Sequence, residues 1–359
     1  MPGQLAIHHR QDSYSERWIA YCDMHSISYR IVNCLDLDIM QQLASANALL
    51  WNWNQADPRE QLVARHIIRA AEMMGLTVFP NTCTCWHFDD KVAQKYLLEA
   101  IGAPLVPTYV FYNLDEALHW LNETSYPKVF KLRKGAGSSN VKLVRSANEA
   151  ATLARRAFST GFSPVPHYGQ DAVRRYRATR KRGELLNVVK RIPEVLARIR
   201  NMKRLMGSEK GYIYFQEFIP NNNFDIRVTI IGNRAFAFTR NVRPGDFRAS
   251  GSGDIVYDSG RIHQRCLEIA FDVAQKTKSQ SMAFDFVIAD SREPLIVEVS
   301  YSYNAQAVYN CPGYWDASMT WYEGHVWPQD AILIDLLNHV DSSRTYKLQP
   351  ELTTGIKAP

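Results

Sequence analysis

The first 80 residues alternate short apolar segments with longer amphipathic ones, and this alternation constrains the fold more than any other feature of the chain. Strands of period two that alternate with helical patterns over short connections are typical of a parallel, doubly wound sheet. The expected strands are residues 4–8, 29–33, 48–51 and 77–79, and the expected helices are residues 16–25 and 58–74. We therefore predict an N-terminal parallel α/β domain.

Polar and aromatic side chains follow the first and third of these strands. Ligands of open α/β sheets bind beyond the carboxyl ends of the strands, where the strand order reverses. His8, Arg10, Trp51 and Trp53 would lie there and are candidate substrate residues. The alternative is that the tryptophans belong to the core and the histidine is an ordinary surface group.

Length and composition limit the class of protein. A chain of 359 residues predicts two or three packed units, and 46% hydrophobic residues exclude wholesale disorder. The sequence holds no uncharged apolar stretch near the roughly 18 residues that span a bilayer. Its six cysteines form no CxxC pair, which indicates reduced thiols rather than a zinc site or a disulfide framework. We expect a cytoplasmic protein.

The basic charge is concentrated in one segment. Between Arg155 and Lys210 the sequence has 15 Lys or Arg against 4 acids, a local net charge of +11 within a total of +6. Beyond Tyr168 and Tyr176 the segment lacks the interleaved aromatic residues of nucleic-acid-binding modules, so nucleic acid is a poor candidate partner. It favours docking on an anionic partner: an acidic glycan, a lipid-linked intermediate or a membrane face. The alternative is a solvated helical insertion that only keeps the protein soluble.

The stretch VFKLRKGAGSSNVKLV predicts strand, flexible loop, strand. Glycines let backbone N–H groups approach a polyphosphate, and serines add further donors. The preceding strand places Lys131 and Arg133 on one face and Phe130 on the other. The candidate phosphate-binding residues of the loop are Gly135, Gly137, Ser138 and Ser139. The alternative is an ordinary hairpin tip.

A first hairpin is predicted in DIRVTIIGNRAFAFTR, with Gly232 and Asn233 as a two-residue turn. This turn places Asp225 opposite Arg240, and Arg227 on the same face. The other face is apolar, which indicates a charged site above a core. A solvated surface with a cross-strand ion pair would give the same pattern.

A second hairpin, AFDFVIADSREPLIVEVS, gives the sharper signal. A connection at residues 290–293 places Asp285 directly opposite Glu298 on two otherwise apolar strands. Opposed like charges destabilise a sheet unless a proton or a cation neutralises them, and paired carboxylates suit Mg²⁺ bound together with phosphate. The alternative is a register shift of one residue, or an acid that is merely exposed.

Together, in this order, these motifs resemble the ATP-grasp superfamily over roughly residues 6–304, and the layout is most similar to the RimK-like amino-acid ligases. The resemblance implies an N-terminal pre-ATP-grasp domain followed by two antiparallel sheets with helices. It implies domains at residues 1–87, 88–210 with a basic insertion at about 160–210, and 211–345, followed by a tail at 346–359. It also implies ATP, with one or two Mg²⁺ for which Mn²⁺ can substitute, and a homodimer is an open possibility.

The resemblance assigns roles to individual residues. Asp285 and Glu298 match the magnesium carboxylates, and the usual Glu-x-Asn ending is replaced in this chain, so that Ser300 or Asn304 would be the third ligand. Arg227, Arg240 and Arg248 would stabilise phosphates, the acyl phosphate or the substrate carboxylate. The residues implied for the nucleotide itself are Lys91, Lys131, Glu217, Phe218, Ile219 and Asp225, in addition to the glycine and serine loop.

The reaction implied by the resemblance joins a carboxylate to an amine or a thiol. The carboxylate attacks the γ-phosphate of ATP, and the nucleophile then displaces phosphate from the acyl phosphate. An amino acid or a uronic acid of a surface glycan is a plausible substrate class. The alternatives are a kinase of a small hydroxylated substrate and an ATP-binding regulatory module without chemistry. The basic segment leaves open a location peripheral to the membrane.

Overall fold

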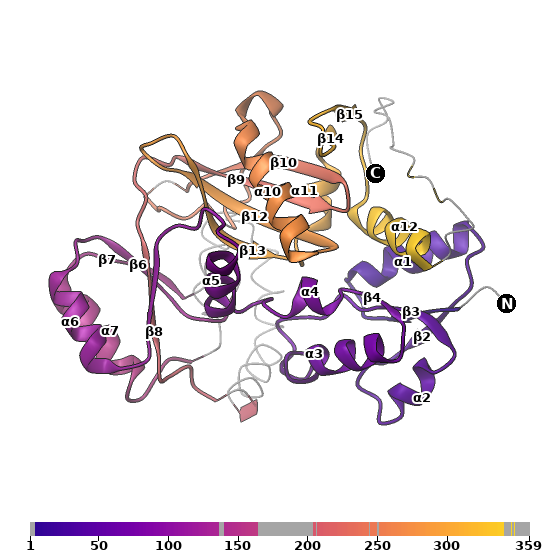
Figure 1. The fold of residues 1–359 in the computed structure, drawn as a ribbon, viewed down its shortest axis with the longest axis horizontal. Coiled ribbons are helices and arrows are strands. Elements are labelled where there is room, and N and C mark those ends of the chain that lie inside the picture. Colours follow the sequence, from indigo (N-terminus) through magenta and orange to yellow (C-terminus); the bar gives the residue numbers. More distant parts are fainter. Residues whose placement is uncertain are drawn as a thin grey trace, which may run out of the picture.

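The structure of the protein is a computed structural model. It describes residues 4–135, 140–163, 204–205, 207–243, 245–249, 251–340, 346 and 348. Most of the basic segment, residues 164–203, and the loop residues Gly137, Ser138 and Ser139 lie outside these residues. Figure 1 shows a mixed α/β molecule built around three sheets.

The N-terminal sheet is parallel, as the sequence predicts, with strand order β2-β1-β3-β4. Two of its helices begin with side-chain caps: Ser13 accepts a hydrogen bond from Ser15 N–H, and Asp57 accepts one from Arg59 N–H ahead of Pro58. The elements are β1 (Gln4–His8), α1 (Tyr14–Met24), β2 (Tyr29–Val32), α2 (Ile39–Leu43), β3 (Ala46–Leu50), α3 (Pro58–Met73), β4 (Thr77–Phe79) and α4 (Thr82–Cys85).

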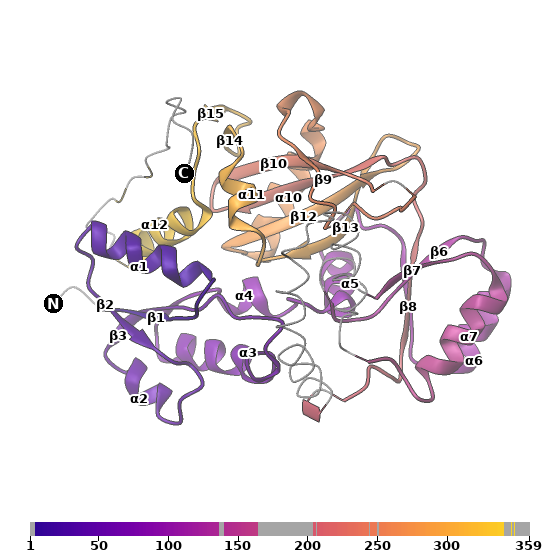
Figure 2. The same ribbon diagram turned by 180° about the vertical axis from the view of Figure 1, so that it is seen from behind.

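The last helix of the described chain packs against this first sheet. Helix α12 (Pro328–Val340) lies beside α1 and β4, and Figures 1 and 2 show it next to α1 from both sides. Arg17 forms a salt bridge of 2.6 Å with Asp330, and the Trp18 indole donates to the Gln329 carbonyl. The packing of α12 therefore crosses the sequence-based division at residues 87 and 211, which remains a prediction.

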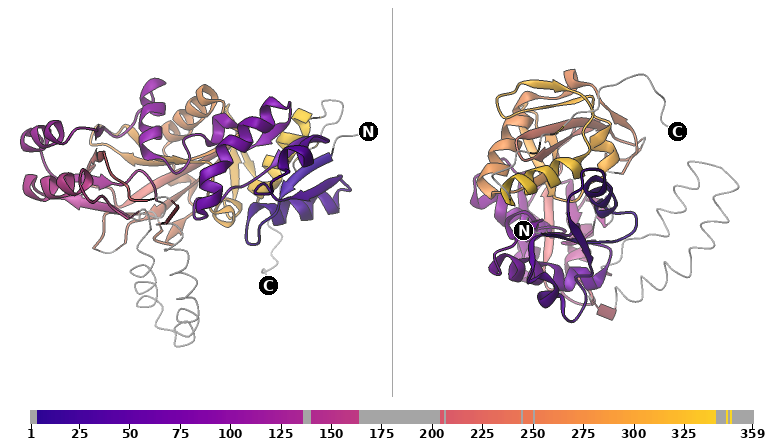
Figure 3. Two further views of the ribbon diagram at one scale, coloured as in Figure 1. Left: turned by 90° about the horizontal axis from the view of Figure 1, so that it is seen from below. Right: turned by 90° about the vertical axis from the view of Figure 1, so that its right-hand side faces the viewer.

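A small antiparallel sheet with order β5-β8-β6-β7 forms the middle of the chain. Helices α6 and α7 cover it, and Figure 3 places these helices at the end of the molecule opposite the first sheet. The elements are α5 (Lys91–Ala100), β5 (Thr108–Phe111), α6 (Leu114–Glu123), β6 (Lys128–Lys131), β7 (Val141–Val144), α7 (Ala147–Ala157) and β8 (Ile213–Glu217).

The largest sheet has seven strands and is antiparallel, with the path β13-β12-β9-β10-β14-β15 and β11 beside β10. Helix α10 packs on one face, with Ile269 and Val273 against Val228 and Phe284. The elements are β9 (Phe224–Ile231), β10 (Arg234–Asn241), β11 (Ile255–Val256), η1 (Ser259–Arg261), α10 (Gln264–Thr277), β12 (Ser281–Ile288), β13 (Pro294–Ser300), α11 (Ala305–Tyr309), β14 (Gly313–Trp315) and β15 (Trp321–Glu323). The fold class predicted from the sequence is confirmed.

The two hairpins have the registers on which the site depends. In the first, Arg240 faces Asp225 and Phe238 faces Arg227. In the second, Asp285 faces Glu298, but the strand halves nearer the turn pair one residue out of the expected register. The pairing shifts at a bulge between Asp285 and Phe286, which the turn length alone does not predict. The bulge restores the opposed carboxylates.

No helix in the described parts of the chain combines the length and the apolar character that spanning a membrane requires.

Candidate functional site

Two cavities meet at the opposed carboxylates. The first cavity lies between the small sheet and the large sheet, and the second lies between the large sheet and the segment that leads into α5. Their empty volumes are about 970 and 1050 Å³. Of the residues that line them, Asp285 and Glu298 are common to both. We call this pair the seam.

Asp285 is held at the seam by two arginines. The guanidinium of Arg227 donates two hydrogen bonds of 2.7 Å to the two carboxylate oxygens, and Arg240 contacts the same carboxylate at 2.9 Å. Burial alone would raise the pKa of this carboxyl, but the two cations outweigh burial and hold its pKa below the usual range. Asp285 is therefore an anion, which is the form that binds a metal ion.

Arg240 extends this network to Asp225. Its guanidinium donates to both oxygens of Asp225, one at 2.8 Å, and both side chains are buried. Burial raises the pKa of the Asp225 carboxyl although Arg240 opposes the shift, and the two carboxylates raise the pKa of Arg240 against its burial. Because Asp225 lines the first cavity and Arg240 lines the second, the pair is part of the wall between them.

Two lysines stand on the first-cavity side of the seam. Lys91, at the start of α5, lies 3.2 Å from Glu298 and donates to the Gly135 carbonyl at 2.7 Å. Lys131 donates to the Gln216 side-chain oxygen at 2.6 Å. Burial lowers the pKa of Lys131 to about 8, although nearby Glu298 and Asp285 oppose the shift. The predicted nucleotide lysines are thus brought together with the predicted metal carboxylates.

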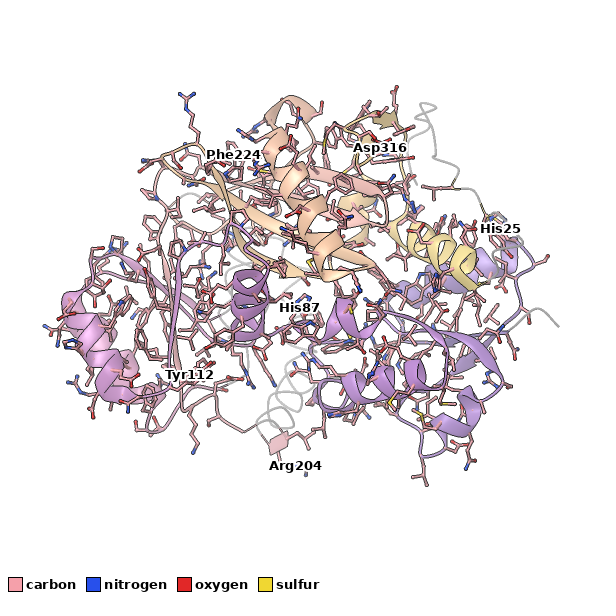
Figure 4. The ribbon with its side chains drawn as sticks, viewed as in Figure 1. His25, His87, Tyr112, Arg204, Phe224 and Asp316 are labelled. Atoms are coloured by element: carbon pink, nitrogen blue, oxygen red, sulfur yellow. The ribbon has the colours of Figure 1, made fainter. Side chains whose placement is uncertain are left out.

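The remaining wall of the first cavity is largely apolar. Phe218 and Ile219 line it as predicted, with Phe247 placed edge to face against Phe218 at 5.9 Å. Phe224, labelled near the upper left of Figure 4, closes the same cavity from the start of β9. An apolar slot that ends at two lysines suits a flat base at one end and phosphates at the other.

Glu217 lines this cavity too, but its carboxylate is shared with a lysine that the sequence reasoning missed. Lys128 donates to it at 3.0 Å, and Lys128 is 1% exposed beneath Trp120. The two residues are directly opposed where β6 pairs with β8, and because these strands are far apart in the sequence, no local spacing predicts this contact. Gln216, the partner of Lys131, was also missed.

Arg248, a sequence-based candidate for holding the substrate carboxylate or the acyl phosphate, lines the first cavity and not the second. It forms a salt bridge with Asp246 at 2.8 Å and lies over Phe247. The second cavity instead receives Gly251 and Gly253 from the same loop. The arginines that reach the second cavity are Arg227 and Arg240.

The two candidates for a third metal ligand, Ser300 and Asn304, both line the second cavity. The Ser300 hydroxyl donates to the Ser302 carbonyl at 2.7 Å, and the Asn304 side-chain oxygen accepts from Ala307 N–H at the start of α11. Within the described residues, no group of three or more His, Cys, Asp or Glu side chains is placed to hold a metal ion, either at the seam or away from it. Two carboxylates with a hydroxyl or an amide oxygen nearby fit a hard cation such as Mg²⁺.

The N-terminal candidates do not line either cavity. Trp51 and Trp53 are 0% and 1% exposed and belong to the core, which was the alternative interpretation of the sequence. His8 accepts a hydrogen bond from Cys34 N–H at 2.9 Å, and burial lowers its pKa to about 4. Arg10 lies at the same strand ends but lines neither cavity. The sequence pattern predicted that these residues lie at the ends of the strands. It did not show whether their side chains pack in the core or bind a ligand.

Comparisons with known proteins bear on the fold and on one part of the chain. Residues 192–311 match the RimK-like ATP-grasp domain. No curated protein matches the sequence.

Solved structures provide the wider comparison. A D-cycloserine synthetase has a TM-score of 0.55 and 13% identity, covering 94% of this chain and 100% of that chain. A carboxyaminoimidazole ribonucleotide synthase from Aspergillus clavatus with ATP has a TM-score of 0.56 and 10% identity, covering 94% and 77%. A D-alanine–D-alanine ligase from Bacillus anthracis has a TM-score of 0.51 and 13% identity, covering 84% and 87%. At these identities the likeness shows the fold alone.

Proposed function

This chain has the ATP-grasp fold and carries a RimK-like ATP-grasp domain, and on that premise we propose that it is an ATP-dependent ligase that joins a carboxylate to an amine. The observation that carries the proposal is the seam, where two carboxylates flanked by cations separate an apolar slot from a polar cavity. The slot would hold ATP, and the polar cavity would hold the carboxylate and the amine.

The reaction would take place at the seam in two steps. A substrate carboxylate oxygen attacks the γ-phosphorus of ATP, which forms an acyl phosphate and releases ADP. The amine then attacks the acyl carbon, so that a C–N bond forms and the C–O bond to phosphate breaks. Phosphoryl transfer of this kind depends on positioning and on neutralising charge rather than on a protein nucleophile.

The basic side chains match that demand. Lys91 and Lys131 would contact the phosphates from the first cavity, while Arg227 and Arg240 would stabilise the acyl phosphate from the second. A fixed cation that faces developing negative charge in a water-poor site lowers the barrier more than it would in water. Asp285 holds both arginines in position, since its carboxylate is shared between them.

Asp285 and Glu298 would hold Mg²⁺, with Ser300 or Asn304 as a further oxygen ligand. The metal would neutralise phosphate charge during transfer. Lys91 is the cation that pairs with Glu298 in the structure, so metal binding would exchange one cation for another at that carboxylate. One metal ion or two are compatible with this ligand set.

We propose an amino acid or a uronic acid as the carboxylate substrate, since the second cavity combines arginines with amide and hydroxyl groups. The test is a screen of carboxylates and amines, singly and in pairs, with ADP release and product mass as readouts. ADP release that requires both partners, with an amide as product, supports the ligase. ADP release with a hydroxyl compound alone and a phosphate ester as product would replace the ligase by a kinase.

The basic segment between Arg155 and Lys210 remains a separate proposal. Docking on an anionic glycan, a lipid-linked intermediate or a membrane is motivated by its charge of +11. Co-sedimentation with anionic and neutral vesicles, and with an anionic glycan, tests it. Binding that is absent in every case contradicts it.

A further inference from the structure

Asp89 lines the second cavity and has no role in the reaction proposed above. It lies between α4 and α5, two residues after His87, which Figure 4 labels near the centre of the molecule. Its φ of 53° is in the left-handed region, which non-glycine residues seldom adopt outside turns and functional sites. Asp89 lines the second cavity together with Arg227 and Glu298.

The carboxylate of Asp89 has hydrogen-bond donors but no cation in contact within the described chain. One oxygen accepts from Gly135 N–H at 2.9 Å, and the other accepts from the Gln61 amide at 3.3 Å. No lysine or arginine of the described chain forms an ion pair with it. The other two carboxylates of this cavity are paired, Asp285 with two arginines and Glu298 with Lys91. Among the described residues that line the second cavity, Asp89 is thus the acid that has no ion pair.

The surroundings of Asp89 suit a group that exchanges a proton. Burial raises its pKa to about 6, nearby Glu298 raises it further, and Lys91 and Lys134 oppose the rise. These are the charged groups that face it from β13, from α5 and from the loop after β6. A carboxylate with such a pKa can both bind an ammonium group and accept its proton near neutral pH.

We propose that Asp89 binds the amino group of the incoming nucleophile as ammonium and takes its proton before attack. This inference rests on the proposed ligase function. The ammonium loses one proton to the Asp89 carboxylate, and the free amine attacks the acyl carbon. The C–N bond forms, the C–O bond to phosphate breaks, and the departing phosphate takes the second nitrogen proton. Asp89 then releases its proton to water.

Hydroxylamine separates this role from the rest of the reaction. It is mostly neutral at pH 7, so it can capture an acyl phosphate as a hydroxamate without a base, whereas an alkylamine is mostly protonated and needs one. The probe is a panel of free amino acids as carboxylate donors with MgATP, in which either hydroxylamine or a second amino acid serves as nucleophile. Hydroxamate and amide are quantified separately.

The test variant is Asp89→Asn, because the Asn side-chain oxygen can still accept from Gly135 N–H while the charge is lost. The matched control is Asp90→Asn, which alters the neighbouring carboxylate, the N-cap of α5, to an equally good cap. We expect Asp89→Asn to form hydroxamate within about twofold of the unmodified protein while amide formation at pH 7 falls about 100-fold or more. Raising the pH should restore part of its amide formation, and Asp89→Glu should retain more activity than Asp89→Asn.

Three outcomes decide the matter. Equal losses of hydroxamate and amide in Asp89→Asn would overturn the inference, since the residue would then act on acyl phosphate formation or on folding. Unchanged amide formation would overturn it as well. If the unmodified protein formed no hydroxamate with any carboxylate, the ligase function itself would fall, and this inference with it.

Discussion

The two cavities that meet at the seam differ in chemistry although they share Asp285 and Glu298. The first is an apolar slot with lysines at one end, and its walls come from Phe218, Ile219 and Phe247. The second adds two arginines, amides and hydroxyl groups to apolar side chains such as Phe88 and Phe238. A flat base gains from apolar contact, whereas a reacting carboxylate needs directed donors. The difference indicates that binding and chemistry are divided between the cavities.

The seam carries the largest predicted effect. Glu298→Gln keeps the side-chain volume and removes one charge that both cavities share, so ATP turnover should fall at least about 100-fold. Asp285→Asn should behave similarly, with loss of the charge that orients Arg227 and Arg240. Steady-state ADP release at saturating Mg²⁺ measures the effect. Nearly unchanged turnover in either variant would mean that the two cavities do not depend on a shared pair of carboxylates.

The control for this prediction is Glu293→Gln, in the exposed turn of the same hairpin. It alters an acid of equal size on the same chain segment without reaching either cavity. Its turnover should match that of the unmodified protein, and the melting temperatures of all three variants should agree within a few degrees. A loss of turnover in the control would indicate damage to the hairpin rather than to a metal site.

The wall between the cavities should contribute to stability as well as to chemistry. Arg240→Met would leave Asp225 without its ion pair in a buried setting, and breaking such a pair costs about 3–5 kcal/mol of unfolding free energy. Arg227→Met should cost less, because Asp285 keeps its contact with Arg240. Urea unfolding of both variants measures the difference. Equal losses of unfolding free energy in the two variants would mean that Arg240 contributes no more to the stability of this wall than Arg227 does.

Sequence reasoning predicted the seam because strand pairing converts residue spacing into contact. Two-residue turns fix the first hairpin, so Asp225 and Arg240 could be paired in advance. The bulge beside Asp285 could not be predicted, because it depends on how β13 fits the rest of the sheet. That the expected pair Asp285 and Glu298 still faces each other owes as much to the bulge as to the turn.

Residue spacing in the sequence did not predict which candidate side chains are buried in the core. Trp53 lies in the core because Tyr301, from far along the chain, packs against its ring, and no local pattern predicts that contact. The Trp51 indole N–H donates to the Glu60 carboxylate of α3. Arg248 lies in the first cavity, where it forms a salt bridge with Asp246, two residues before it. Asp89 was missed because a single acid beside a helix start has an ordinary structural explanation. Its significance depends on which residues lie across the cavity.

Lysine ionisation should distinguish the first cavity from the second. Burial lowers the pKa of Lys131 to about 8, so this side chain is charged below that pH and neutral above it. ATP affinity of the free protein should therefore fall several-fold as the pH rises from about 7 to about 9, because an attractive charge beside the phosphates is lost. Lys131→Met should bind ATP more weakly at neutral pH and lose most of this pH dependence. Calorimetric titration with a non-hydrolysable ATP analogue at both pH values measures it. A pH dependence that persists in Lys131→Met would assign the titration to another group.

The smallest predicted effect lies at the apolar end of the first cavity. Phe247→Ala removes the ring that meets Phe218 edge to face, and aromatic contacts of this kind contribute about 0.5–1.5 kcal/mol, or roughly a two- to tenfold change in affinity. The ATP analogue should therefore bind more weakly by that factor, while the KM of the carboxylate substrate stays unchanged because the ring does not reach the second cavity. Tyr322→Ala, an exposed aromatic on β15 far along the sheet, is the matched control and should leave both values unaltered. If the carboxylate KM changed by the same factor as the nucleotide affinity, binding in the two cavities would be coupled. The linings alone would then not explain which cavity binds which ligand.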